Sequence, residues 1–469
     1  MNNLEKISAT LATITCVAPV GLMEAKQFPV NNERPNIILI LADDVGYEAF
    51  GCNGGSSYKT PNIDKMAEEG MLFNYAYSQP LSAPTRCQFM TGKYNFRNYE
   101  AFGVMSPNNI TFGTLLKNAG YNTGISGKWQ LYGNAGQVHI AGKTGCLPQE
   151  VGFDNYFVWH TTFPYLEIPD SVDILKDLKW LGYSEQNQRE SRYKDPVILT
   201  EKGKFTFHDK YGPDLFMKWC NEFIDENKNS DKPFFLYYPM VLMHDPFQAT
   251  PKNKDYYKSS WKDKSNPKYF GEMMEYMDDI VGNIIKKVND SGIAENTIII
   301  FTADNGTNRK IYSKWNNQTI RGDKGYPREW GIHVPMIAYW KGHITPGSVN
   351  DNMIDFTDFV PTLMDIAQCP LPKDFKTDGL SFYDQLLGKK DAKKRDFIFG
   401  YYEPKWGTFE NAIWLQDCTH TWKLYDDGRF YNLKDDPNEE NPIKESELSP
   451  MERKLRDDMK QRIIDILNS

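Results

Sequence analysis

The chain has 469 residues, of which 40% are apolar and 25% charged, and this balance is typical of a folded globular protein. Its 62 Asp and Glu residues outnumber 54 Lys and Arg residues and give a formal net charge of −8. That charge argues against nucleic acid as a partner, because phosphate binding needs a basic face. No run of about 18 or more apolar residues occurs, so the sequence predicts no membrane-spanning helix.

Residues 1–25 have the features of a secretory signal peptide. Lys6 precedes a weakly apolar run of small residues, and Ala25 offers a small side chain at a cleavage point. A disordered cytosolic tail is the alternative reading of this segment. After cleavage six scattered cysteines would remain with no C-x-x-C pair, so we expect neither a zinc site nor a disulfide scaffold.

Several apolar, β-branched runs predict strands that are buried on both faces of a sheet. They alternate with segments of helical spacing, which indicates an α/β fold with a large parallel or mixed sheet and helices on both faces. The predicted strands are Asn36–Ala42, Tyr121–Ser126, Pro233–Met243, Thr297–Ala303 and Val334–Trp340, and the predicted helices are Thr111–Ala119 and Glu272–Val288.

The pattern changes near residue 395. Short strand-like segments separated by turn residues follow, and Ser449 and Glu452 form a predicted capping box for a last helix over Pro450–Leu467. We therefore expect a main domain over residues 34–394 and, over residues 395–469, a small antiparallel sheet subdomain with a closing helix. Residues 152–213 show little periodicity and are expected to form long loops that border a pocket.

Polar side chains follow three of the predicted buried strands. Asp43 and Asp44 come after the first strand, His244 after another, and Asp304 and Asn305 after a third. Ligands of open α/β sheets bind beyond the carboxyl ends of the strands, so these residues are candidates for one site. Carboxylate and amide oxygens favour Ca²⁺, or else Mg²⁺, over zinc or copper. A turn or a helix cap is the alternative for each single Asp.

The segment from Ser82 to Gly92 contains the pattern S-x-P-x-R. A purely structural interpretation makes Ser82 the N-cap of a helix, with Pro84 in its first turn. The segment also resembles the signature of the type I sulfatases of the alkaline phosphatase superfamily. That signature is Cys or Ser, any residue, Pro, usually Ser or Thr, then Arg, with Thr-Gly farther on. The two interpretations are compatible.

Further blocks of this family recur in chain order, so that the resemblance extends from about residue 34 to 440. It implies a catalytic sulfatase domain with the alkaline phosphatase-like fold, followed by the family's C-terminal subdomain. The blocks are Asp43-Asp44, Gly127-Lys128-Trp129, His244 with Pro246, Asp304-Asn305-Gly306, Lys324-Gly325, Glu329 with Gly331, Val334-Pro335, and Tyr431-Asn432-Leu433 with Asp436-Pro437-Asn438-Glu439.

The resemblance implies that Ser82 is oxidised after translation to Cα-formylglycine, whose hydrate would lie on a calcium ion and attack the sulfur of a sulfate ester. A serine at this position implies a bacterial chain matured by an anaerobic-type sulfatase-maturating enzyme. The predicted signal peptide adds the expectation of a periplasmic or secreted location. A Cys-to-Ser replacement at position 82 would give the same sequence. Asp43, Asp44, Asp304 and Asn305 would complete the calcium site.

The same resemblance assigns roles to the cationic residues. Arg86 and Lys128 would hold the hydrate and the sulfate oxygens, Lys324 would bind another sulfate oxygen, and His244 would protonate the leaving alcohol. One residue departs from the family pattern: Gln130 stands where the family usually has His. Glutamine can donate and accept hydrogen bonds but cannot take a proton, so Gln130 is expected only to orient the hydrate.

Aromatic loops and the predicted export favour a sulfated saccharide as substrate, with Arg328 and His333 as candidate sugar-binding residues. Three alternatives remain open. A phosphonate or phosphodiester hydrolase of the same superfamily would use the same nucleophile. A noncatalytic glycan-binding relative would be expected to lack Ser82, Arg86 or Lys324, and a two-metal mutase-like enzyme would need more His residues than the seven present.

Overall fold

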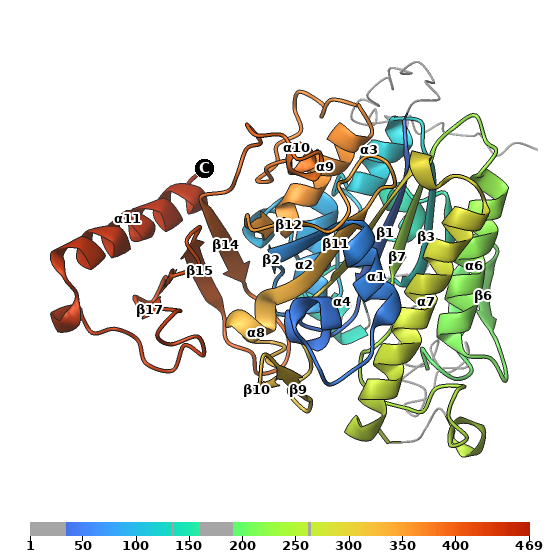
Figure 1. Ribbon diagram of the computed structural model, residues 1–469, viewed down its shortest axis with the longest axis horizontal. Coiled ribbons are helices and arrows are strands. Elements are labelled where there is room, and N and C mark those ends of the chain that lie inside the picture. The colour runs from blue at the N-terminus through green and yellow to red at the C-terminus, as the bar shows by residue number, and fades with distance from the viewer. Residues whose placement is uncertain (1–33, 134, 160–190, 261–263) are drawn as a thin grey trace, which may run out of the picture.

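The computed structural model describes residues 34–133, 135–159, 191–260 and 264–469 (Figure 1). The predicted signal peptide, residues 1–25, lies outside the described residues. Within the described ranges, no helix combines the length and the apolar character needed to cross a membrane.

The main domain is built on a mixed sheet of 11 strands in the described part of the chain. Strand β1 (Asn36–Ala42) lies near its centre, parallel to both β7 (Phe234–Pro239) and β8 (Thr297–Ala303). All residues of these three strands are buried, as continuous apolar runs require. The others are β2 (Met71–Tyr77), β3 (Asn122–Lys128), β4 (Asn155–Trp159), β5 (Val197–Thr200), β6 (Gly203–Thr206), β11 (His333–Tyr339), β12 (Ser348–Asn350) and β13 (Ile354–Asp355).

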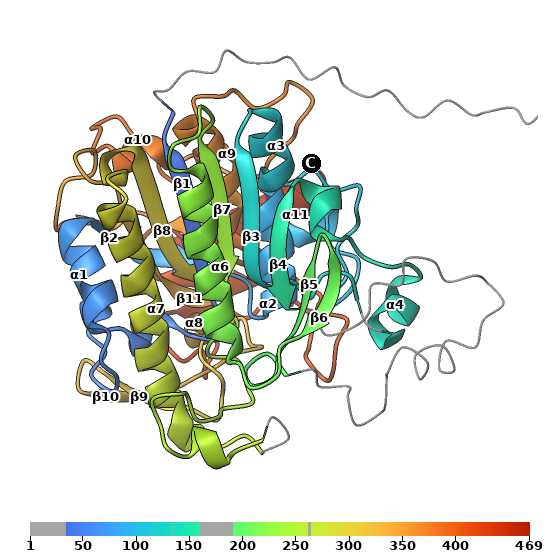
Figure 2. The same ribbon diagram turned by 90° about the vertical axis from the view of Figure 1, so that its right-hand side faces the viewer.

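Helices cover both faces of this sheet, as predicted (Figure 2). One face carries α1, α6 and α7, and the other carries α2, α3 and α9. Their bounds are α1 (Pro61–Glu69), α2 (Ser82–Thr91), α3 (Phe112–Asn118), α6 (Gly212–Asn227), α7 (Phe270–Asp290) and α9 (Phe359–Ile366); shorter helices are α4 (Ala135–Ala141), α8 (Glu329–Ile332) and α10 (Tyr383–Leu386).

A second, antiparallel sheet lies beside the main domain at the C-terminal end (Figure 1). Its strands follow one another in chain order, and α11 (Pro450–Leu467) closes it, with the Ser449 side chain accepting from the Glu452 amide as the capping box predicts. An apolar cluster that includes Tyr77, Ile332 and Trp414 joins this sheet to the main domain. The strands are β14 (Phe397–Tyr402), β15 (Ala412–Asp417), β16 (Trp422–Tyr425) and β17 (Phe430–Asn432).

Three local predictions were wrong. Part of residues 152–213 forms β4, β5 and β6 instead of long loops, and residues 160–190 lie outside the described residues. Strand β7 ends at Pro239, because Met240–Met243 are apolar but turn within the core instead of extending. Ser82 is not the N-cap of α2, since Leu81 holds that position and the Ser82 hydroxyl is engaged elsewhere.

Candidate active site

The polar residues that follow β1, β7 and β8 meet at one edge of the sheet. Because the three strands are parallel, their carboxyl ends lie side by side. The Asp43 amide donates to the Leu242 carbonyl at 2.8 Å, and the Asp44 amide donates to Asp304 Oδ1 at 3.0 Å. The predicted convergence of these strand ends is therefore present in the structure.

Asp44 is the best-connected carboxylate of this cluster. It has a left-handed backbone conformation with φ 61°, which turns its side chain toward the neighbouring strand end. Asn305 Nδ2 donates to Asp44 Oδ1 at 2.9 Å, and Lys324 Nζ donates to Asp44 Oδ2 at 2.5 Å. The Nε2 atom of His244 lies 3.8 Å from the same oxygen. Asp44 therefore brings an amide, an ammonium group and an imidazole together.

Ser82 lies in the first turn of α2 and faces two cationic side chains. Its Oγ accepts hydrogen bonds from Arg86 Nε at 3.0 Å and from Lys128 Nζ at 2.9 Å. Arg86 is one helical turn farther along α2, so its side chain lies on the same face as Ser82. Lys128 Nζ also donates to Asp43 Oδ2 at 2.8 Å and thereby connects Ser82 to the acidic cluster.

The segment that carries Lys128 depends on the glycine before it. Gly127 has φ 115°, and a Cβ atom there would collide with the carbonyl oxygen of Pro239 in β7. The Arg86 guanidinium donates to the Trp129 carbonyl, which fixes the end of β3 against α2. Gln130 follows directly, half-buried and with φ 49°, so its backbone lies beside these residues.

Burial and mutual charge perturb the ionisable groups of the cluster in opposite directions. Burial raises the pKa of Asp43 to about 8, although the Lys128 ammonium opposes that rise. Burial would also raise the pKa of Asp44, but Lys324, His244 and Lys128 together hold it below its ordinary value. Burial, followed by repulsion from Lys324, holds the pKa of His244 well below its ordinary value. The cluster therefore places several like charges close together with little solvent to screen them.

The donor atoms of the cluster fit a hard divalent cation. Asp43 Oδ1 and Asn305 Oδ1 are buried and have no hydrogen-bond partner among the described residues, although buried acceptors are normally paired. Ligand atoms of Asp43, Asp44 and His244 lie within 4.8 Å of one another. The four residues proposed as ligands supply only oxygen atoms, which are the ligands that Ca²⁺ and Mg²⁺ prefer. They are Asp43, Asp44, Asp304 and Asn305.

The sequence analysis missed two neighbours of the cluster. Arg192 Nη1 lies 3.8 Å from Asp43 Oδ2, and its guanidinium lies over the Trp159 ring at 4.0 Å. The Tyr193 hydroxyl contacts the carbonyls of Val241 and His244 at 2.8 and 2.5 Å and so supports the turn that carries His244. Neither residue belongs to a recognisable motif, because both follow a long stretch without periodicity.

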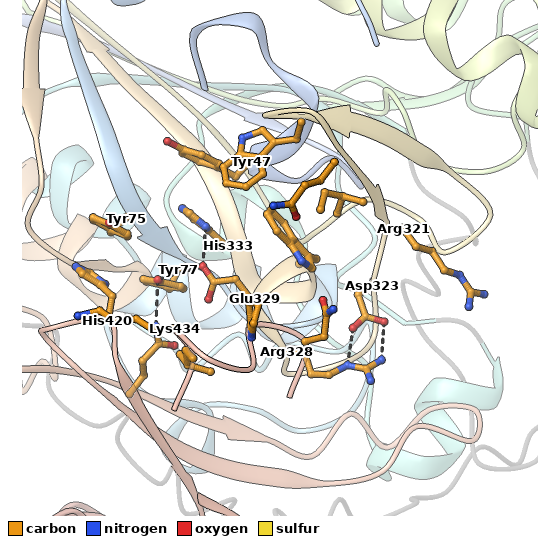
Figure 3. A pocket seen from close by; sticks show the side chains of 18 of the residues that line it. Tyr47, Tyr75, Tyr77, Arg321, Asp323, Arg328, Glu329, His333, His420 and Lys434 are labelled. Atoms are coloured by element: carbon orange, nitrogen blue, oxygen red, sulfur yellow. Dashed lines mark hydrogen bonds and ion pairs between the residues drawn. The ribbon is translucent and has the colours of Figure 1, made fainter. Parts of the chain in front are cut away.

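Two predicted sugar-binding residues do not reach the acidic cluster. Arg328 and His333 line a separate cavity of about 860 Å³, named here the Tyr–His cavity (Figure 3). Its lining includes Tyr47, Tyr75, Tyr77, His333 and His420. The assignment of Arg328 and His333 to substrate binding therefore stays a prediction.

Comparison with known proteins agrees with this geometry. A family model described as "Sulfatase" matches residues 35–369, and one for the C-terminal region of N-sulphoglucosamine sulphohydrolase matches residues 322–466. Arylsulfatase A of Homo sapiens is 28% identical over 82% of this chain and 76% of its own length. N-acetylgalactosamine-6-sulfatase of Mus musculus is 30% identical over 84% of this chain and 75% of its own length. The crystal structure of Ps i-CgsB in complex with k-i-k-neocarrahexaose superposes with a TM-score of 0.72 at 24% identity, over 92% of each chain.

Proposed function

Because the chain belongs to the sulfatase family, whose members are sulfuric ester hydrolases, we propose that it removes sulfate from sulfated carbohydrates. One observation carries the proposal: the Ser82 hydroxyl lies between Arg86 and Lys128, next to the carboxylates of the cluster. Sulfated sugars are favoured because N-acetylgalactosamine-6-sulfatases are among the relatives that match most of this chain.

The proposed cofactors are one calcium ion and a formylglycine formed from Ser82 by an anaerobic-type sulfatase-maturating enzyme. Asp43, Asp44, Asp304 and Asn305 would hold the ion together with the side chain at position 82. When bound, calcium would supply positive charge at the nucleophile, and the aldehyde hydrate would supply a hydroxyl more reactive than that of serine. The unpaired oxygens of Asp43 and Asn305 support this ligand set.

The cationic residues would bind the sulfate group of the ester. Arg86 Nη2 is buried without a hydrogen-bond partner among the described residues, so it has a donor available for a sulfate oxygen. Lys128 holds the hydroxyl of position 82 in place, and Lys324, in the loop before α8, donates to Asp44. The arrangement would stabilise negative charge that increases on the sulfate oxygens in the transition state.

His244 is the proposed proton donor to the leaving alcohol. Its Nδ1 lies 2.6 Å from the Asp245 carbonyl, which orients the ring so that Nε2 faces Asp44. Since burial disfavours the charged ring, the negative charges of Asp44 and of the bound ester would have to hold the proton on Nε2. The Gln130 amide can form hydrogen bonds but cannot act as an acid or a base, and we assign it only an orienting role.

The location and the domain boundaries belong to the same proposal. A signal peptide over residues 1–25 would direct the chain to the periplasm or the medium, with a catalytic domain over residues 34–394 and a subdomain over residues 395–469. The competing activity is hydrolysis of phosphonate esters or phosphodiesters, and the competing class is a noncatalytic glycan-binding protein.

A mass spectrum of the peptide that contains Ser82 tests the proposal. After co-expression with an anaerobic-type maturating enzyme, the serine should lose two hydrogens, and an aldehyde reagent should label it. The Ser82→Ala variant is the matched control and should show neither change. The matured protein should release inorganic sulfate from sulfated monosaccharides faster than it cleaves phosphonate esters. Unmodified Ser82, or a preference for phosphonate esters, would overturn the proposal.

A further inference from the structure

The Tyr–His cavity lies outside the catalytic cluster. Its volume of about 860 Å³ is within the range of roughly 300–1,000 Å³ that small-molecule sites occupy. Its walls include residues of β2, the hairpin of β9 (Tyr312–Trp315) and β10 (Gln318–Arg321), helix α8, and the C-terminal sheet with the loop at residues 433–440. Tyr47, His333 at the start of β11, and the loop residues Arg309, Asp323 and Arg328 also line it. None of the proposed calcium ligands lines it.

Stacked rings form one side of this cavity (Figure 3). His333 stacks on Tyr47 with ring centroids 4.1 Å apart, and on Tyr77 at 5.2 Å. His420 stacks on Tyr75 at 3.5 Å. Such rings combine flat apolar surface with hydroxyl and imidazole groups at their edges, a combination that suits a sugar ring, which has an apolar face and hydroxyls around it.

Three polar atoms in this wall lack partners among the described residues: Glu329 Oε2, Gln416 Oε1 and His420 Nδ1. Their side chains are nevertheless held in place. Glu329 Oε1 lies 2.8 Å from His333 Nδ1, and Gln416 Nε2 donates to the Tyr77 hydroxyl at 3.1 Å. Buried polar atoms without partners are costly, and a ligand rich in hydroxyl groups would supply the missing hydrogen bonds.

The opposite side of the cavity is cationic. Arg309, Arg321 and Arg328 line it, whereas Lys434 lies near His420 and Tyr77, on the side of the stacked rings (Figure 3). The lining as a whole has these four cations against the three carboxylates Asp323, Glu329 and Glu440. Asp323 holds the Arg328 guanidinium through two hydrogen bonds of 2.7 and 2.9 Å, so this arginine is fixed in position. Figure 3 shows Arg321, Asp323 and Arg328 across from the stacked rings. A local positive excess in a chain of net charge −8 favours an anionic ligand.

Two loops separate the Tyr–His cavity from the catalytic cluster. Lys324 contacts Asp44 on the catalytic side, whereas Asp323, the preceding residue, lines the cavity. Tyr47 lines the cavity and follows Asp44 by only three residues. Consecutive Cα atoms are about 3.8 Å apart, so the two sites lie within roughly 11 Å along this loop. One oligosaccharide is therefore long enough to reach both.

We propose that the Tyr–His cavity binds an anionic sugar residue of the glycan substrate, at a position other than the sulfate ester that is cleaved. This inference rests on the proposed function for the identity of the glycan. The stacked rings would contact the sugar, and Glu329 and Gln416 would accept from its hydroxyls. Arg321 and Lys434, which lie on different sides of the cavity, would attract its sulfate or carboxylate group (Figure 3).

Binding to a sulfated galactan hexasaccharide tests the inference on the full chain, expressed without a maturating enzyme so that turnover does not interfere. The double variant Arg321→Ala/Lys434→Ala removes two exposed cations and leaves the core intact. We expect its Kd, measured by isothermal titration calorimetry, to rise at least about tenfold, since each lost charge-assisted hydrogen bond weakens binding. Lys218→Ala, an exposed lysine of α6, is the matched control and should bind as the unaltered chain does.

The two proposals fail in different ways. An unchanged Kd in the double variant, or no binding of the hexasaccharide by the unaltered chain, overturns the cavity assignment whether or not sulfate is released. A weakened double variant in a matured protein that releases no sulfate supports the cavity and contradicts the proposed function. Equal binding of the chemically desulfated hexasaccharide would overturn the requirement for an anionic sugar.

Discussion

Replacing Lys128 by methionine should impair both activity and stability, because this side chain joins the two halves of the candidate active site. Its ammonium group lies 2.9 Å from Ser82 Oγ, 2.8 Å from Asp43 Oδ2 and 3.8 Å from Asp304 Oδ2. The side chain is only 2% exposed. Methionine has a similar length and shape but no charge, so Lys128→Met removes the three interactions with little change in volume.

The magnitude follows from the burial of the pair. Removing one partner of a buried ion pair costs about 3–5 kcal/mol. Without Lys128, the buried Asp43 carboxylate would keep only weaker interactions with more distant cations such as Arg192, 3.8 Å away. With an unfolding entropy of about 2.1 cal/mol/K per residue, a chain of 469 residues loses roughly 1 °C of Tm per kcal/mol. We therefore expect Tm to fall by about 3–5 °C. Loss of one preorganised donor should also lower kcat/KM by about 10²–10³-fold.

Differential scanning calorimetry and sulfate release on the same preparations measure both effects. Lys117→Met is the matched control: Lys117 also pairs with an aspartate, Asp154, at 2.5 Å, but its side chain is 43% exposed. Exposed pairs contribute about 0–1 kcal/mol, so this control should keep its Tm within about 1 °C and its full activity. A Lys128→Met protein that keeps kcat/KM within about threefold of the unaltered enzyme would refute the role assigned to the ammonium group.

Three further outcomes are expected. Gly127→Ala should lower Tm by at least about 2 °C, because the backbone has φ 115° and a Cβ would collide with a carbonyl oxygen. Gly428→Ala is the control, since Gly428 has φ 94° but open space around it, and it should lower Tm less. Equal losses of Tm would contradict the steric argument. Glu439→Gln should destabilise the C-terminal sheet by about 3–5 kcal/mol in urea unfolding. The reason is that Lys423, which lies 2.8 Å away and is fully buried, loses its counter-charge. An unchanged urea midpoint would show that the ion pair is not essential. Calcium at about 100 times its Kd should stabilise the chain by about 2.7 kcal/mol in thermal unfolding, compared with the chain in EGTA. Asn305→Ala should reduce that stabilisation. If calcium does not stabilise the unaltered chain, the metal is removed from the proposal.

The strands that position the site could be predicted from the sequence because they are buried on both faces. The runs Asn36–Ala42 and Thr297–Ala303 match β1 and β8 residue for residue, since a continuous apolar run ends where polar residues begin. The same rule failed at β7. Met240–Met243 are as apolar as the strand before them, and an apolar pattern does not distinguish a buried strand from a buried turn.

Some side chains of the candidate active site could be predicted from the sequence, and others could not. Asp43, Asp304 and their neighbours could be identified because strand ends in a parallel sheet converge. Arg192 could not, because its position depends on packing over Trp159, a contact between segments with no shared pattern. The N-cap interpretation of Ser82 relied on how common serine is at that position, whereas the family resemblance made Ser82 the nucleophile held by Arg86 and Lys128. In the structure its hydroxyl faces Arg86 and Lys128, and local preference gives no information on such contacts.

The charges of the site explain why so many ionisable groups are buried together. Three carboxylates, Asp43, Asp44 and Asp304, face four cations: Arg86, Lys128, Arg192 and Lys324. The site therefore has a positive excess even before a divalent ion is added, although the chain as a whole is acidic. Burying unpaired charge costs free energy, and apolar residues of similar volume would often be more stable. An anionic group bound at this point would compensate the excess, so the arrangement favours binding of a sulfate ester at the expense of the stability of the free protein.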